Sequence, residues 1–144
     1  MPEKPKELEN LVRIGKLAVE PATPGEIEGL LKSGRERLAD ARNEVLALSS
    51  RFDLAYNAAH AFSLAALRWR GYRSDSRYLV FQALPHSLGL PVAVWRVLAK
   101  AHELRNVAEY EGHFDADTTI LKNLIEAAEA VQVAVAALPT LPEG

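Results

Sequence analysis

The sequence predicts an all-α fold, a single-domain bundle of about five helices. Apolar residues recur at intervals of three and four along most of the chain, which is the spacing of amphipathic helices. Proline and glycine separate these segments, and the one strand-like run, residues 78–81, has no second candidate strand to pair with. A chain of 144 residues is long enough for one domain with its own hydrophobic core.

Composition excludes several classes of protein. The absence of cysteine excludes disulfides and thiol chemistry, and a formal net charge of -2 gives no overall basic field for nucleic acid, although a local patch could bind it. The N-terminus lacks the apolar core of a signal peptide, and no stretch is long and charge-free enough to span a bilayer. We expect a cytoplasmic protein that does not contact the membrane. No motif for a cofactor is present.

The chain divides into three parts. Residues 1–22 are expected to form a short helix and a linker, residues 23–139 the bundle, and residues 140–144 a C-terminal tail. Thr23 and Glu26 fit a capping box, in which the hydroxyl accepts a backbone N–H three residues on and the carboxylate reaches back. The apolar residues of the short helix are Leu8, Leu11 and Val12.

The first half of the bundle contains the most apolar segment. Before it, we expect a break or kink at Ser33-Gly34, because helical apolar spacing occurs on both sides of this pair. The apolar residues after the break are Leu38, Ala41, Val45 and Leu48. Residues 52–69 form a helix that is apolar on nearly all sides, and such a helix is normally central.

The second half of the bundle begins with a helix over residues 77–88 that Pro85 should kink or shorten. A long helix over residues 91–112 follows, and a last helix is capped by Asp115 or Asp117. The apolar stripe expected to face the core from the long helix comprises Leu90, Val94, Val97, Ala101, Leu104 and Ala108. The apolar face of the last helix comprises Leu121, Leu124, Ile125, Ala128, Val131, Val135 and Leu138.

A second strip of the long helix, beside its apolar stripe, is the first candidate site. It comprises Trp95, Leu98, His102, Arg105, Asn106 and Glu109, with Tyr110 at its edge. Arg105 offers five donors in a fixed arrangement that suits phosphate, and Asn106 and Tyr110 add an amide and a hydroxyl. The alternative is a satisfied polar strip between helices, in which Arg105 pairs with Glu109.

A basic cluster is the second candidate site. It comprises Arg68, Arg70, Arg73 and Arg77, with Trp69, Tyr72 and Tyr78 interleaved. This composition suits a phosphate backbone with stacked bases. The alternative is a solvated helix end, where basic residues are favoured. Residues 113–117 alternate potential metal ligands, but a loop followed by a helix cap explains them equally, and we predict no metal site.

The order of elements resembles the HEPN domain, a helical bundle found in prokaryotic toxins, defence proteins and nucleotide-associated proteins. The resemblance rests on the apolar helix 55–69, the arginine-rich turn after it, and Arg105-Asn106 near the end of a later helix, and covers roughly residues 35–138. Active HEPN ribonucleases carry an arginine, a polar residue, three further residues and a histidine. In this chain Tyr110 stands where that histidine would be.

The resemblance implies a protein that binds RNA or a nucleotide, as a degenerate or atypical relative of the HEPN ribonuclease toxins. It also implies a homodimer with facing motif helices, for which Trp95 and Leu98 would suit the seam, and a cognate antitoxin as a potential partner. Two alternatives stay open. One is a non-enzymatic dimeric interaction module, and the other is an active metal-independent ribonuclease that uses His102 or Tyr110.

Overall fold

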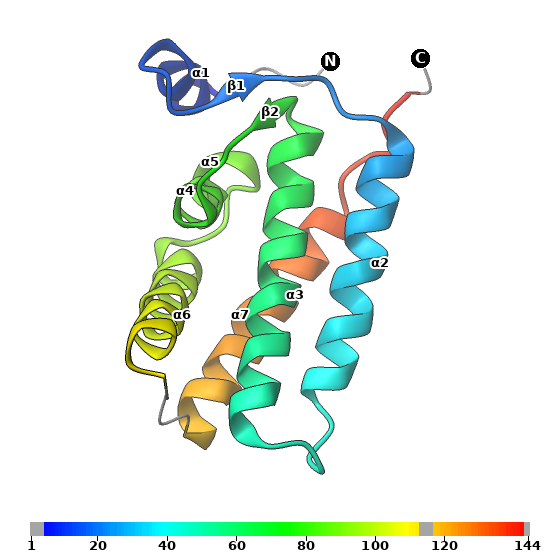
Figure 1. The fold of residues 1–144 in the computed structure, drawn as a ribbon. Helices are drawn as coiled ribbons and strands as arrows, with labels where there is room; N and C mark the ends of the chain where they lie inside the picture. Colours follow the sequence, from blue (N-terminus) through cyan, green and yellow to red (C-terminus); the bar gives the residue numbers. More distant parts are fainter. Residues whose placement is uncertain (1–4, 113–116, 143–144) are drawn as a thin grey trace.

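The computed structural model confirms the all-α bundle (Figure 1). It describes residues 5–112 and 117–142, except for the side chain of Tyr110. Within this part of the chain the elements are α1 (Lys6–Arg13), β1 (Ala18–Val19), α2 (Pro24–Ala41), α3 (Leu48–Trp69), β2 (Tyr72–Arg73), α4 (Arg77–Gln82), α5 (Leu84–Ser87), α6 (Val92–Glu111) and α7 (Thr118–Ala136). None of the described helices is both long and apolar enough to cross a membrane.

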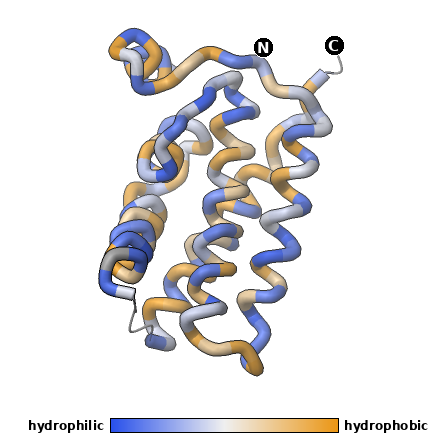
Figure 2. The backbone as a smooth tube through the Cα atoms, viewed as in Figure 1, coloured by the Kyte–Doolittle hydropathy of each residue, from blue (hydrophilic) through white to orange (hydrophobic). Residues whose placement is uncertain are grey.

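Helix α3 is central, as its composition predicted. It packs most extensively against α2 and α7, and α4, α5 and α6 lie on the side of α3 opposite α2 (Figure 1). Its fully buried hydrophobic residues are Ala55, Tyr56, Ala58, Ala59, Phe62, Ala65, Ala66 and Leu67. Hydrophobic and hydrophilic residues alternate along the flanking helices (Figure 2), because these bury one face each while α3 buries nearly all of its circumference.

The expected break at Ser33-Gly34 does not occur, because α2 runs without interruption from Pro24 to Ala41. Gly34 is buried against the ring of Phe62 on α3, and a Cβ at this position would lie 2.5 Å from Cε1 of that ring. The glycine therefore serves the close approach of α2 and α3 rather than a kink. This explains why it is tolerated inside a helix, where glycine is otherwise unfavourable.

We expected Val45 to belong to a helix, because the apolar spacing continues past the end of α2. This expectation is wrong. The helix ends at Ala41, and Val45 lies in the following loop with 91% of its surface exposed. The side-chain oxygen of Asn43 accepts the N–H of Val45 at 3.1 Å. Such local side-chain bonds compete with helical hydrogen bonding, and here they accompany the end of the helix.

Several helix boundaries follow the predicted caps. Thr23 Oγ1 accepts the N–H of Glu26 at 3.2 Å, and Asp117 Oδ1 accepts that of Ile120 at 2.7 Å. Gly112 ends α6 with φ of 77°, a conformation that glycine adopts without steric cost. Pro85 lies in the first turn of α5, so the segment 77–88 is divided into two short helices rather than continuing as one.

The two-stranded sheet was not predicted. Strands β1 and β2 pair antiparallel, with Ala18 opposite Arg73 and Val19 opposite Tyr72. Two residues per strand are too few for an alternating pattern to be recognised in a sequence. The sheet and α1 lie across the end of the bundle where α3 finishes (Figure 1). A second small core lies beneath them, formed by Leu8, Leu17, Leu67, Tyr72, Val80 and Ala83.

Helix α6 buries more of its surface than we expected. The predicted stripe does pack against the core, through Leu90, Val94, Val97, Ala101 and Leu104. Leu98, which we assigned to a seam between two copies, is fully buried within the chain, together with Ala101. Trp95 and His102 are partly buried against Tyr78 of α4 and Tyr56 of α3. The assignment of Leu98 to a dimer seam is therefore wrong, because α4 packs beside α6 and covers this strip from within the monomer. A homodimer formed through other surfaces stays a prediction.

The packing at Gly34 leads to a first prediction. Gly34→Ala should lower the free energy of unfolding by about 1–3 kcal/mol, because the added methyl group overlaps the buried ring of Phe62. Gly29→Ala is the matched control in the same helix, since a Cβ there has no atom within 4 Å, and it should stabilise the protein by up to about 1 kcal/mol. Urea unfolding of both variants measures the difference. Equal effects of the two substitutions would contradict the assigned role of Gly34.

Candidate functional site

A hydrogen-bonded chain of three side chains connects α3 to α6. The hydroxyl of Tyr56 is 2.8 Å from Nδ1 of His102, and Nε2 of His102 is 3.2 Å from the amide nitrogen of Asn106. Since that amide nitrogen can only donate, Nε2 accepts, and the proton of the neutral imidazole lies on Nδ1 and is donated to the Tyr56 oxygen. Tyr56 is fully buried and fixes the orientation of His102, while the donor of Asn106 sets its tautomer.

Two arginines from different helices converge on the ring of the same tyrosine. The Cζ of Arg105 on α6 lies 4.9 Å from the centroid of the Tyr56 ring, and the Cζ of Arg77 on α4 lies 5.7 Å from it. A guanidinium over an aromatic face is attracted by the negative charge density of the ring. Tyr56 thus gathers two positive charges and one histidine at a single place on the bundle. We call Tyr56, Arg77, His102, Arg105 and Asn106 the Tyr56 cluster.

The two arginines differ in how their charge is balanced. Arg105 is 27% exposed and lies between two exposed carboxylates, with Nε 3.3 Å from Asp53 Oδ1 and Nη1 3.2 Å from Glu109 Oε1. Arg77 is exposed and donates at 3.0 Å to the side-chain oxygen of Asn57, which is neutral. Among the described residues, no ion pair of Arg77 with a carboxylate is formed. As far as the structure describes the chain, one guanidinium of the cluster has no balancing anion.

Both histidines near these arginines are held neutral. Burial lowers the pKa of His60 to about 4, and the positive charges of Arg77 and Arg105 add to this effect. Burial also lowers the pKa of His102, again with help from Arg105 and Arg77, while Glu109 opposes the shift. His60 lies on α3, one turn after Tyr56, with its ring edge-on to Phe81 at 5.9 Å. At neutral pH the imidazole of His102 is consequently a proton acceptor.

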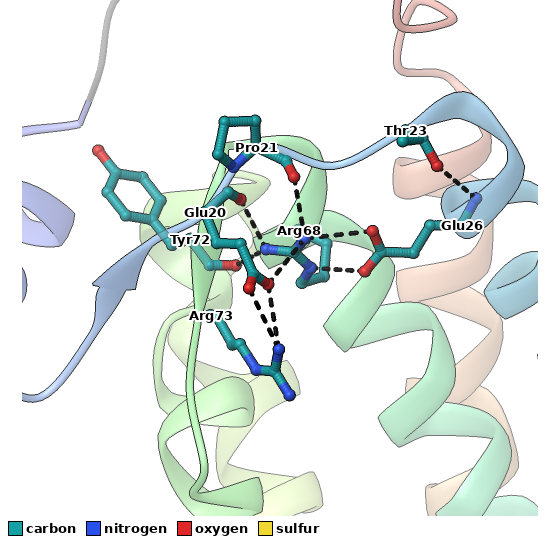
Figure 3. A network of polar contacts seen from close by, with 7 residues as sticks. All are labelled: Glu20, Pro21, Thr23, Glu26, Arg68, Tyr72 and Arg73. Atoms are coloured by element: carbon teal, nitrogen blue, oxygen red, sulfur yellow. Dashed lines mark hydrogen bonds and ion pairs between the residues drawn. The ribbon is translucent and has the colours of Figure 1, made fainter.

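The predicted basic cluster is not one surface. Arg68 is only 5% exposed, and its guanidinium is enclosed by protein oxygen atoms (Figure 3). Its Nε and Nη2 donate to the two carboxylate oxygens of Glu26 at 2.6 and 3.1 Å. The carbonyl oxygens of Glu20, Pro21 and Tyr72 accept the remaining hydrogen bonds. The capping box predicted that the carboxylate of Glu26 reaches back to the start of its own helix. In the structure this carboxylate bonds to Arg68 instead.

Trp69, Arg70, Tyr72 and Arg73 also bond to other residues of the protein. Arg70 donates to the carbonyl of Ser87 at 3.0 Å and lies 5.1 Å from the ring centroid of Trp69, whose Nε1 donates to the carbonyl of Pro139 at 2.7 Å. Arg73 pairs with Glu20 at 3.2 Å. Tyr72 is buried, and its hydroxyl donates to Glu9 at 2.6 Å. Of the four predicted arginines, only Arg77 reaches the Tyr56 cluster.

Part of the predicted site lies outside what the structure describes. Tyr110 belongs to α6, but its side chain is not described, and residues 113–116, with two of the potential metal ligands, fall outside the described residues. Within the described part, no group of three or more histidine, aspartate or glutamate residues is arranged to hold a metal ion.

The sequence contained a signal for the residues that we missed. Asp53, Tyr56, Asn57 and His60 recur at intervals of three and four along α3, so they form one polar stripe on an otherwise apolar helix. This stripe faces α4 and α6, where it contacts the two arginines and His102.

No protein-family model, no curated protein and no solved structure matches the chain. The geometry of the Tyr56 cluster is therefore the basis for assigning a function.

The pKa of His60 leads to a second prediction. In the unfolded chain this histidine takes up a proton near pH 6.5, but in the folded protein only near pH 4, so between these values the unfolded state binds more protons. The stabilising effect of neutral His60 is present above pH 6.5 and is lost as the pH falls towards 4. The free energy of unfolding should be about 2 kcal/mol lower at pH 5 than at pH 7 from this residue alone.

Urea unfolding at the two pH values tests this prediction. In the His60→Gln protein the difference between pH 5 and pH 7 should be smaller by about 2 kcal/mol, while the part due to His102, whose pKa is also lowered, should remain. His86→Gln is the control, because it removes a histidine near α1, away from this cluster. If His60→Gln and the parent showed the same pH dependence, His60 would not be the titrating group.

Proposed function

We propose that this chain binds RNA or a nucleotide at the Tyr56 cluster, as a HEPN-like protein. The observation that carries the proposal is the convergence of Arg77 and Arg105 on one buried ring, with the charge of Arg77 balanced by no carboxylate among the described residues. Arg105 already has Asp53 and Glu109 beside it, whereas Arg77 has no carboxylate partner among these residues. A phosphate supplies the missing anion and accepts the paired donors of arginine.

The carboxylates beside Arg105 do not oppose this proposal. Asp53 and Glu109 are 57% and 62% exposed, and exposed ion pairs contribute only about 0–1 kcal/mol. A phosphate can replace one of them at small cost. Until then the pairs hold the guanidinium of Arg105 in position over the ring of Tyr56, so little ordering is needed when a ligand binds.

The HEPN resemblance agrees with this location. Arg105 and Asn106, the two residues of the chain that fit the family motif, both belong to the Tyr56 cluster. On this proposal the chain is a degenerate or atypical relative of the ribonuclease toxins. A homodimer, a cytoplasmic location and a cognate antitoxin belong to the same proposal, as consequences of the resemblance.

A metal-independent endoribonuclease is the second candidate function. It is favoured by the hydrogen bonds of His102, because its neutral Nε2 is a proton acceptor, Tyr56 holds the ring in position and Asn106 sets the tautomer. In such a reaction Nε2 accepts the proton of a 2′-hydroxyl, and the 2′ oxygen bonds to phosphorus. The bond from phosphorus to the 5′ oxygen breaks, and the imidazolium returns its proton to that oxygen. Arg105 would stabilise the charge on the phosphate.

Binding gives a third prediction. Arg77→Gln and Arg105→Gln should each weaken binding of single-stranded RNA roughly tenfold, because each removes charged hydrogen bonds to phosphate. The dependence of log affinity on log salt should become shallower by about 0.7 for each phosphate that the variant no longer neutralises. Arg96→Gln, on an exposed position of the same helix α6, is the matched control for the change in net charge. Fluorescence anisotropy at several salt concentrations measures both quantities.

Two results would contradict the proposed binding site or the proposed function. If the affinity and salt dependence of both variants equalled those of Arg96→Gln, the Tyr56 cluster would not be the binding surface. If no variant and no parent protein bound RNA or a nucleotide, the non-enzymatic interaction module would be favoured.

Cleavage gives a fourth prediction. We expect little metal-independent cleavage of a labelled RNA by the parent protein, and more by Tyr110→His. The substitution restores the family motif and provides a group that titrates near neutrality, where tyrosine does not. Tyr110→His combined with Arg105→Ala is the control and should be inactive. Strong cleavage by the parent in the presence of EDTA, lost in His102→Gln, would instead establish the second candidate.

A further inference from the structure

Four aromatic rings are in contact beside the two arginines. Tyr78 of α4 lies edge-on to Trp95, with ring centroids 6.2 Å apart, and its ring is 6.0 Å from that of His102. The ring of His102 is in turn 6.1 Å from that of Tyr56 and nearly parallel to it. Trp95 and His102 are seven residues apart on α6, which is two helical turns, so they present one face to Tyr78.

Tyr78 is the ring of this group that reaches the surface most. It is 42% exposed, whereas Trp95 and His102 are partly buried and Tyr56 is fully buried. Contacts with two rings hold its position, so little conformational freedom remains to be lost when a ligand packs on it. The preceding residue is Arg77, the exposed arginine whose charge no carboxylate balances among the described residues.

We infer that Tyr78, supported by Trp95, is a base-stacking subsite, where a nucleobase packs on the exposed ring while its phosphate contacts Arg77 and Arg105. This inference rests on the proposed function and specifies its ligand. Bases in a duplex are already stacked and paired, whereas an unpaired base can lie on an aromatic side chain. The ligand is therefore a nucleotide with a free base, either within single-stranded RNA or as a free mononucleotide.

Tyr78 is one of the three aromatic residues that the sequence suggested for stacking, and the structure engages the other two elsewhere. Trp69 is hydrogen-bonded to Pro139 and contacts Arg70, and Tyr72 is buried beneath the two-stranded sheet. Tyr78 alone combines an exposed ring with direct proximity to the Tyr56 cluster, among the aromatic residues that the structure describes. A stacked base would cover the surface of Tyr78 that its two aromatic neighbours leave open.

Four ligands test the inference: a short single-stranded RNA, an abasic ribose-phosphate oligomer of equal length, the RNA duplex, and adenosine monophosphate. Tyr78→Ala should weaken binding of the single-stranded RNA by about 5- to 100-fold. It should leave binding of the abasic oligomer unchanged, because that oligomer has no base to stack. Tyr78→Phe keeps the ring and should bind like the parent. The parent should bind the duplex more weakly than the single strand.

Tryptophan fluorescence provides a second readout. A base stacked on Tyr78 lies next to Trp95, so binding should change the emission of the parent protein. The change should persist in Trp69→Phe, which removes the distant tryptophan, and should disappear in Trp95→Phe. If adenosine monophosphate produces the change and competes with RNA in a Tyr78-dependent manner, the ligand is a free nucleotide. If only the oligonucleotide does so, the ligand is single-stranded RNA.

The failures of the two proposals are distinguishable. If Tyr78→Ala bound single-stranded RNA as the parent does, while Arg77→Gln and Arg105→Gln were weakened, the base subsite would be overturned and the proposed function retained. Equal affinity for the abasic oligomer and the RNA would overturn the subsite in the same way. If none of these substitutions changed the affinity, both proposals would be overturned.

Discussion

Helix α3 is buried on nearly every side, so its large polar side chains need partners within the protein, although the buried hydroxyl of Ser63 has no hydrogen-bond partner among the described residues. Burying a polar group without a hydrogen bond costs several kcal/mol by transfer estimates, and a buried charge costs more. At one end of α3, Arg68 meets this constraint by binding Glu26 and three carbonyl oxygens. Near the middle, Tyr56 meets it by bonding to His102. The two networks have opposite consequences for function.

The Arg68 network fixes the architecture. It joins the end of α3 to the linker before α2 and to the first turn of α2, and the β1–β2 pair lies beside it (Figure 3). The adjacent Glu26 keeps a lowered pKa because it accepts hydrogen bonds from Arg68 and lies beside its charge. An arginine whose donors are all directed at protein oxygens leaves little for a ligand. Arg68 therefore holds the N-terminal segment against the end of α3.

The Tyr56 network instead leaves a guanidinium and an imidazole nitrogen available to a ligand. Tyr56 accepts a hydrogen bond from His102 and attracts two guanidinium groups. Arg77, however, donates to the neutral amide of Asn57, and the lone pair on Nε2 of His102 faces the exposed amide of Asn106. Burial of α3 thus organises a face on which cations, neutral imidazole and an exposed aromatic ring lie together. On the function proposed above, such a face would bind a phosphate with an attached base.

The sequence by itself determined the helices and several of their ends, because periodicity, caps such as Thr23 and Asp117, and breakers such as Pro85 act within a few residues. It also singled out Arg105, Asn106 and His102. Only the tertiary structure decided that the buried side of α6 includes Leu98 and that Arg68 and Arg77, nine residues apart, serve different purposes. Those outcomes depend on contacts between residues far apart in the chain, and no local pattern specifies which helix will lie against which.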